Sequence, residues 1–119
     1  MAFKLGDERR GIKTSAIRKK NVGEGTIARA NMDGSIDVDP SVNLNSKFGK
    51  RVIKHEQAHL DQMQSGRAAY GDDWVMWEDK IYLRREINGE PVIDGPAGRL
   101  PEGHEDHPWE AEAIEAEEN

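Results

Sequence analysis

The first regular pattern of apolar and polar positions lies between residues 25 and 40. The stretch GTIARANMDGSIDVDP has the dipeptide Asp33-Gly34 near its centre, which favours the tight two-residue turn of a β-hairpin. Pro40 ends the second strand, because proline cannot donate a ladder hydrogen bond. The strand-type side chains around the turn are those of Ile27, Ile36 and Val38. We therefore predict a hairpin over residues 25–39.

A helical pattern follows this hairpin. Apolar and imidazole side chains recur at intervals of four, three, four and four residues, which places them on one stripe of a helix. The stripe consists of Phe48, Val52, His55, His59 and Met63. Asn45 or Ser46 can cap the start of the helix, and Gly66 can end it. The pattern predicts a helix from about residue 45 or 46 to Gln64, with this stripe facing the core.

The rest of the chain predicts further short strands and one more helix. Strand-type segments surround the turn signals Glu78-Asp79 and Asn88-Gly89. Residues 95–107 are rich in Gly and Pro and predict a loop. Pro108 suits the first turn of a helix over the segment PWEAEA, in which Ala and Glu favour propagation. These patterns predict an α+β fold with a small, mostly antiparallel sheet.

The composition fits a single small domain. The chain has 119 residues, of which 35% are hydrophobic and 34% charged, so its core is expected to be thin. Three tryptophans, Trp74, Trp77 and Trp109, are expected in this core. We predict one domain over residues 25–119, preceded by an extended basic arm over residues 1–24. There is no cysteine, so a metal site must use His, Asp or Glu.

Charge is unevenly distributed along the sequence. The net charge is −6, yet residues 1–20 hold seven basic and two acidic side chains, and residues 101–119 hold eight acids and no Lys or Arg. We expect both ends to be solvated, and the acidic balance does not favour nucleic-acid binding. Neither a membrane span nor a secretory signal is recognisable. The expected location is the cytoplasm or a particle assembled there.

The strongest chemical signal is the stretch HEQAH, residues 55–59, which matches the motif H-E-x-x-H. On a helix, His55 and His59 lie one turn apart on the same face, so both can bind one ion. Glu56 lies about 100° further round the helix, beside the ion, where it can act as a base. Two buried imidazoles would otherwise each need hydrogen-bond partners. The motif therefore predicts a metal site.

Two histidines leave a catalytic zinc site one protein ligand short. The extended motif with a third histidine does not apply, because Ser65 stands at that position and Gln62 replaces the expected glycine. A carboxylate from a later helix is the other option, and Glu110 and Glu112 are available. Two residues apart on a helix, they point about 160° apart, so only one of them can bind.

The order of these motifs resembles the zincin metallopeptidases, and most of all their smallest gluzincin-type members. Those proteins join an H-E-x-x-H helix to a downstream helix that carries a Glu, often followed by Ala. The resemblance implies Zn²⁺ held by His55, His59 and Glu112, with Glu110 in reserve. The segments ANMDGSIDVD, HEQAH and PWEAEA also resemble small proteins encoded by tailed bacteriophages, although this chain is too short for the second lobe of ordinary zincins.

The resemblance implies a zinc-dependent metallopeptidase in which Glu56 takes a proton from the attacking water and passes it to the leaving amine. An extended protein or peptide substrate would pair with the edge of the predicted hairpin. An oxyanion donor is also needed. The candidates are Tyr70, Tyr82, His104 and His107, of which the two histidines are otherwise expected to be solvated in a loop. The alternative function is a zinc-stabilised structural or interaction protein, such as a component of a phage particle that contacts other phage structural proteins, with little or no turnover.

Overall fold

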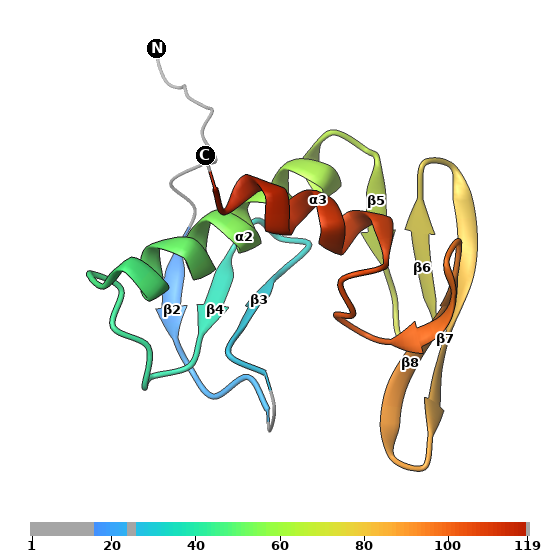
Figure 1. Ribbon diagram of the computed structural model, residues 1–119, viewed down its shortest axis with the longest axis horizontal. Helices are drawn as coiled ribbons and strands as arrows, with labels where there is room; N and C mark the ends of the chain where they lie inside the picture. Colours follow the sequence, from blue (N-terminus) through green and yellow to red (C-terminus); the bar gives the residue numbers. More distant parts are fainter. Residues whose placement is uncertain (1–15, 24–25, 119) are drawn as a thin grey trace.

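The computed structural model describes residues 16–23 and 26–118, which form the α+β fold that the sequence predicts (Figure 1). In chain order the elements are β2 (Ile17–Lys19), β3 (Ala28–Ala30), β4 (Ile36–Val38), α2 (Lys47–Gln64), β5 (Ala68–Tyr70), β6 (Trp74–Trp77), β7 (Lys80–Ile87), β8 (Glu90–Gly95), β9 (Gly98–Pro101) and α3 (Pro108–Ala116). None of the helices in these described ranges is long and apolar enough to cross a bilayer.

The first sheet has three strands in the order β2-β4-β3. The predicted hairpin is present, because β3 pairs antiparallel with β4, and Ala30 lies opposite Ile36. β2 pairs parallel with the other side of β4, so residues 17–19 of the predicted arm belong to a sheet. The rest of that arm, apart from residues 16 and 20–23, lies outside the described residues. Ile36 and Val38 are buried beneath α2 and share a core cluster with Leu60 of that helix.

Helix α2 begins and ends close to the predicted positions. The Ser46 hydroxyl accepts a hydrogen bond from the Gly49 amide at 2.9 Å and so caps the first turn. The buried face, however, is rotated from the predicted stripe, and Phe48 is 54% exposed. The buried helix residues are Gly49, Val52, Glu56, Leu60 and Gln62. His55 and His59 consequently lie at the margin of the buried face and not at its centre.

The second sheet is an antiparallel meander of five strands, β5-β6-β7-β8-β9. The predicted turns at Glu78-Asp79 and Asn88-Gly89 are both present, and all four residues have positive φ, as type I′ hairpin turns require. The prediction of a loop over residues 95–107 is wrong in part, because Gly98–Pro101 forms β9 and pairs with β8. Glycine and proline are uncommon in strands, so the composition of this segment did not predict β9.

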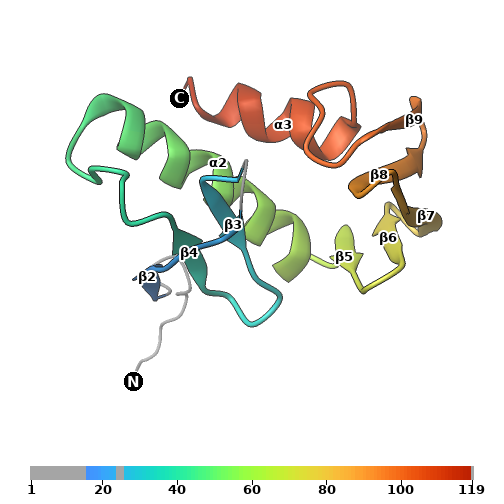
Figure 2. The same cartoon turned by 90° about the horizontal axis from the view of Figure 1, so that it is seen from below.

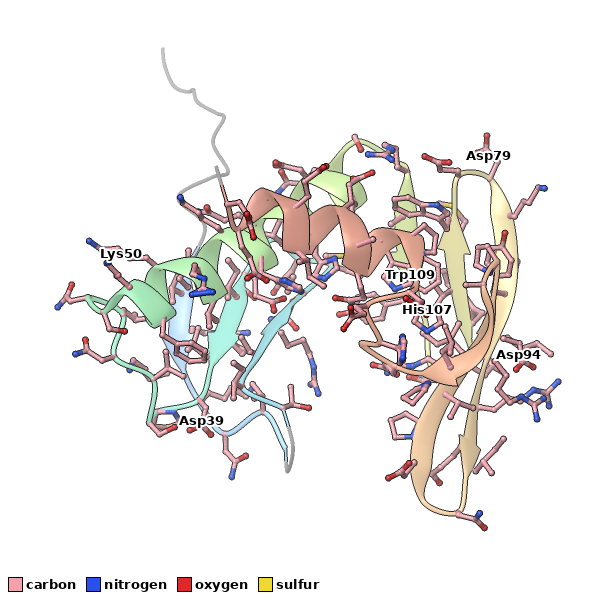
Figure 3. The ribbon with its side chains drawn as sticks, in the orientation of Figure 1. Asp39, Lys50, Asp79, Asp94, His107 and Trp109 are labelled. Atoms are coloured by element: carbon pink, nitrogen blue, oxygen red, sulfur yellow. The ribbon has the colours of Figure 1, made fainter. Side chains whose placement is uncertain are left out.

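Helix α3 lies beside α2 in both views (Figures 1 and 2). It links the two sheets, because α2 covers the first sheet and the start of α3 packs against the second. At its start Trp109 is buried against Val75, Trp77 and Ile93 of the five-stranded sheet. Trp77 and Trp109 are therefore core residues, as predicted. His107 is not the solvated residue that the sequence predicts: it is fully buried and stacks on Trp109, with 4.7 Å between ring centroids. Figure 3 shows this pair between α3 and the sheet.

Candidate metal centre

Three side chains from the two helices converge at the junction of α2 and α3. His55 and His59 lie one turn apart on α2, with ring centroids 4.9 Å apart, and Glu110 comes from the first turn of α3. Each residue contributes one ligand atom, and these atoms lie within 4.8 Å of one another. A group of two imidazoles and a carboxylate can hold a metal ion.

One carboxylate oxygen lies between the two imidazoles. Glu110 Oε1 is 2.9 Å from His55 Nε2 and 3.2 Å from His59 Nε2. The three side chains are largely buried, with exposed fractions of 15–18%. Three potential metal-ligand atoms thus lie close together in a largely buried position. Two nitrogens and one oxygen form a common protein ligand set of catalytic zinc.

Glu112, the glutamate that the resemblance favours, lies elsewhere. Arg67 donates to both of its carboxylate oxygens, at 2.9 and 2.8 Å, and the Glu112 side chain is 40% exposed. Trp109 and Ala113 are the buried residues of α3, and this burial sets the rotation of the helix. Glu110 is thereby turned toward the histidines and Glu112 toward Arg67, so the ligand group contains the reserve glutamate.

The remaining imidazole nitrogens also have partners. His55 Nδ1 lies 2.7 Å from Glu117 Oε2, and His59 Nδ1 lies 2.9 Å from Gln62 Oε1. Gln62 is only 2% exposed. Its amide nitrogen donates to the Trp109 carbonyl at 3.0 Å and to Glu112 at 3.2 Å. Both ring nitrogens of each imidazole therefore have a polar partner.

The ionisable side chains of the site have shifted pKa values. Burial lowers the pKa of His55, but hydrogen bonds with Glu110 and Glu117 outweigh it and raise this pKa to about 9. The pKa of His59 is also raised. Burial lowers this pKa, but the hydrogen bond with Glu110 outweighs the effect of burial. At Glu110, burial raises the pKa, but hydrogen bonds from His55 and His59 lower it to about 2. The His55 imidazole and the Glu110 carboxylate thus hold opposite charges near neutral pH when no metal competes with protons.

Glu56 is buried beside this group, with 8% of its surface exposed. Burial raises the pKa of its carboxyl, and the neighbouring His59 and His55 partly oppose this shift. A carboxyl whose pKa is raised toward neutrality is better suited to exchange protons than an ordinary glutamate. The residue predicted as the base is therefore located next to the candidate ligands.

A cleft of about 490 Å³ opens above the site, between β3 and the five-stranded sheet. His55, Glu56, His59 and Glu110 all contribute to its lining. The β3 side consists of residues 26–30, and the opposite side includes Tyr70, Val75, Ile93 and Trp109. Of the four oxyanion candidates, all within the described residues, Tyr70 lines the cleft, whereas Tyr82, His104 and His107 do not.

Three residues around the site were not anticipated as part of it. Gln62 entered the sequence analysis only as a departure from the longer motif, although its position three residues after His59 places it on the same helix face. Glu117 belongs to a tail that was expected to be solvated. Arg67 follows the helix and has no local signal. The contacts of Glu117 and Arg67 are long-range, so only the fold reveals them.

Comparisons with known proteins identify no relative: no family model, no curated protein and no solved structure matches the chain. The resemblance to zincins and to small phage proteins therefore depends on the sequence motifs. Membership of either family remains a proposal.

Proposed function

We propose that the chain is a zinc-dependent metallopeptidase in which His55, His59 and Glu110 hold the ion. The observation that carries this proposal is the position of Glu110 Oε1, within hydrogen-bond distance of both Nε2 atoms at the cleft. The donor set suits zinc among divalent ions. A bound zinc ion supplies a Lewis acid that polarises the scissile carbonyl.

Glu56 is the proposed proton carrier. It follows His55 in the sequence and so lies beside the ligand group without joining it. Its carboxylate takes a proton from the attacking water and returns it to the leaving amine, which balances the hydrolysis of one peptide bond. Burial raises the pKa of this carboxyl, which makes its ionised form a stronger proton acceptor than an exposed glutamate.

The edge of β3 is the proposed binding surface for an extended peptide. The Asn31 amide donates to Ser35 O, and the Asp39 amide donates to Ile27 O. Because hydrogen-bonded and non-hydrogen-bonded pairs alternate in an antiparallel ladder, the backbone groups of Ala28 and Ala30 point away from β4. β3 is an edge strand of its sheet and lines the cleft. A peptide strand can therefore pair with Ala28 and lie across the metal centre.

Tyr70 is the proposed donor to the oxyanion. Its hydroxyl donates to the Ala30 carbonyl at 3.2 Å, which holds the phenol at the cleft. Tyr70 thus lies beside the path of a peptide that pairs with Ala28, and its hydroxyl would turn from the Ala30 carbonyl to the oxyanion in order to donate its proton there.

The test compares the wild-type protein with Glu56→Gln, which keeps the shape of the side chain but removes the base. Both proteins are loaded with zinc, the bound metal is quantified by mass spectrometry, and cleavage of an unfolded protein and a peptide library is followed. Glu115→Gln makes the same chemical change at an exposed position and serves as control. We expect cleavage by wild type and Glu115→Gln only. Equal cleavage by Glu56→Gln would exclude the proposed mechanism.

A second candidate function is a metal-stabilised interaction protein. The observation that favours it is a row of apolar side chains on one face of β7: Ile81, Leu83 and Ile87 are 63%, 50% and 37% exposed. Alternation along the strand places all three on the same face, and such a row suits contact with another protein. Stoichiometric zinc without cleavage of any substrate by the wild-type protein would favour this function over the peptidase.

A further inference from the structure

We propose that Gln62 and Glu117 are positioning residues that keep the Nδ1 atoms of His59 and His55 protonated and direct both Nε2 atoms at the ion. The inference rests on the proposed metal site, but it does not depend on peptide turnover. Two residues would thus orient the imidazoles before the ion binds: Gln62 in the last turn of α2 and Glu117 at the C-terminal end of α3.

The tautomer of His59 follows from the orientation of the Gln62 amide. The amide nitrogen has two acceptors, Trp109 O at 3.0 Å and Glu112 Oε1 at 3.2 Å, neither of which can donate when Glu112 is ionised. Rotating the amide by half a turn would place its oxygen against both acceptors. Gln62 Oε1 therefore faces His59 Nδ1, at 2.9 Å, and accepts its proton. His59 Nε2 is left as the ligand atom.

Glu112 takes part in this arrangement without being a ligand. Its carboxylate accepts hydrogen bonds from Arg67, which fix its position beside Gln62. The ionised carboxylate in turn accepts the hydrogen bond from Gln62. A chain of contacts thus runs from Arg67 through Glu112 and Gln62 to the imidazole of His59.

The tautomer of His55 follows from Glu117. An ionised carboxylate can only accept hydrogen bonds, so His55 Nδ1, 2.7 Å from Glu117 Oε2, carries the proton. Arg51 Nε lies 4.0 Å from the other oxygen of Glu117. His55 Nε2, which faces Glu110, is then the nitrogen that gives up its proton to bind the ion.

The spacing of the two glutamates explains how one helix serves both nitrogens of His55. Glu110 and Glu117 are seven residues apart, close to two turns of an α-helix, and so lie on the same face. Glu110 lies at the start of α3 and Glu117 is its C-cap residue. The imidazole of His55 fits between them, with one nitrogen toward each carboxylate. Docking of α3 therefore brings a metal ligand and a support for another ligand in one step.

The experiment measures zinc affinity by competition with a chromogenic chelator. Loss of a partner that orients a metal-bound imidazole weakens binding by about 10–100-fold, and we expect this for Glu117→Ala and for Gln62→Leu. Glu117→Gln retains an acceptor oxygen and should recover most of the affinity. Glu118→Ala, at the adjacent exposed position, is the matched control and should bind zinc as wild type does.

A second measurement needs no substitution. Long-range nitrogen–proton correlation NMR of the zinc-loaded wild-type protein with isotope-labelled histidine distinguishes the two tautomers of each imidazole. We expect the proton on Nδ1 of both His55 and His59. Coordination through Nδ1, or unchanged zinc affinity in both Glu117→Ala and Gln62→Leu, would overturn the inference and leave the peptidase proposal intact. Absence of zinc binding by the wild-type protein would overturn both, whereas zinc binding without peptide cleavage would overturn only the peptidase.

Discussion

Arg67 binds both carboxylate oxygens of Glu112, at 2.9 and 2.8 Å, and holds this side chain away from the histidines. The same rotation of α3 turns Glu110 toward them. The first prediction follows from this division of roles. Glu110→Gln should weaken zinc binding by more than about 100-fold, beyond the range for residues that only support a ligand. Glu112→Gln should weaken it by about 10-fold or less.

The measurement is again chelator competition, with circular dichroism to verify that both variants are folded. Glu112→Gln is the matched control, because it removes a charge from the same helix. A larger loss of zinc affinity in Glu112→Gln than in Glu110→Gln would show that the ligand group is incorrectly assigned.

The second prediction concerns thermal stability with zinc bound. His59→Ala removes a ligand and should lower Tm more than Glu56→Gln, which leaves the ligand group complete. At a free zinc concentration a hundredfold above Kd, the ion contributes about 2.7 kcal/mol to the folded state. Differential scanning calorimetry with and without a chelator measures this contribution. Identical Tm values for the two variants would argue that the ion does not stabilise the fold.

The third prediction is a bell-shaped dependence of the stability of the metal-free protein on pH. The pKa of His55 is raised from 6.5 to about 9, so its contribution is complete below pH 6.5 and is lost as the pH rises through 9. The pKa of Glu110 is lowered from 4.5 to about 2, so its contribution is complete above pH 4.5 and is lost as the pH falls through 2. These two contributions overlap fully between pH 4.5 and 6.5.

Urea denaturation of the chelator-treated protein over this range tests the expectation. Glu110→Gln is the informative comparison, because it removes a partner of both imidazoles and should flatten the profile on both sides. A wild-type unfolding free energy that increases from pH 6.5 to 9 would have the opposite sign to the one derived from these contacts.

The fourth prediction separates binding from chemistry at Tyr70. Tyr70→Phe removes the hydroxyl and should lower kcat by about 100-fold or more, in the range for loss of an oxyanion donor, with little change in KM. It should also cost about 1 kcal/mol of stability, since the hydrogen bond to Ala30 is lost. Tyr82→Phe, outside the cleft, should leave both kinetic constants unchanged. An unaltered kcat in Tyr70→Phe would remove Tyr70 from the mechanism.

The fifth prediction concerns Gly49 in the first turn of α2. Replacing a helical glycine by alanine normally stabilises a helix by about 1 kcal/mol. Here a β-carbon would overlap the carbonyl oxygen of Asn43 and lie 2.9 Å from Leu44 Cα, so backbone has to move. We expect Gly49→Ala to destabilise the protein by about 2 kcal/mol. Chemical denaturation measures this, with Lys50→Ala as the neighbouring control, and a stabilised Gly49→Ala would contradict the close approach.

Local signals predict much of this fold because capping and tight turns depend on few neighbouring residues. Ser46 caps α2, and Asn88-Gly89 forms the turn between β7 and β8, as their residue types suggest. Long-range contacts are different. The pairing of β2 with β4 and the burial of His107 beneath Trp109 arise from segments far apart in sequence or from tertiary packing, which no local pattern reports.

In the candidate site, too, some residues could be predicted from local sequence and others only from the fold. His55 and His59 share one helix, so their spacing alone predicts that they converge. The choice between Glu110 and Glu112 depends on the rotation of α3, which is set by packing of Trp109 against the five-stranded sheet. A sequence can show that one of two glutamates faces the histidines, but the docking of the helix decides which one.

The order in which the ligand residues are synthesised has a consequence for the proposed enzyme. Both imidazoles precede Glu110 by about half the chain, and α3 docks only after the five-stranded meander that separates it from α2. A nascent chain that has not yet reached Pro108 holds two of the three ligand residues and lacks both glutamates that flank His55. Catalytic competence would thus arise only once α3 has been synthesised, which would protect a chain that still lacks this helix from attack by its own active centre.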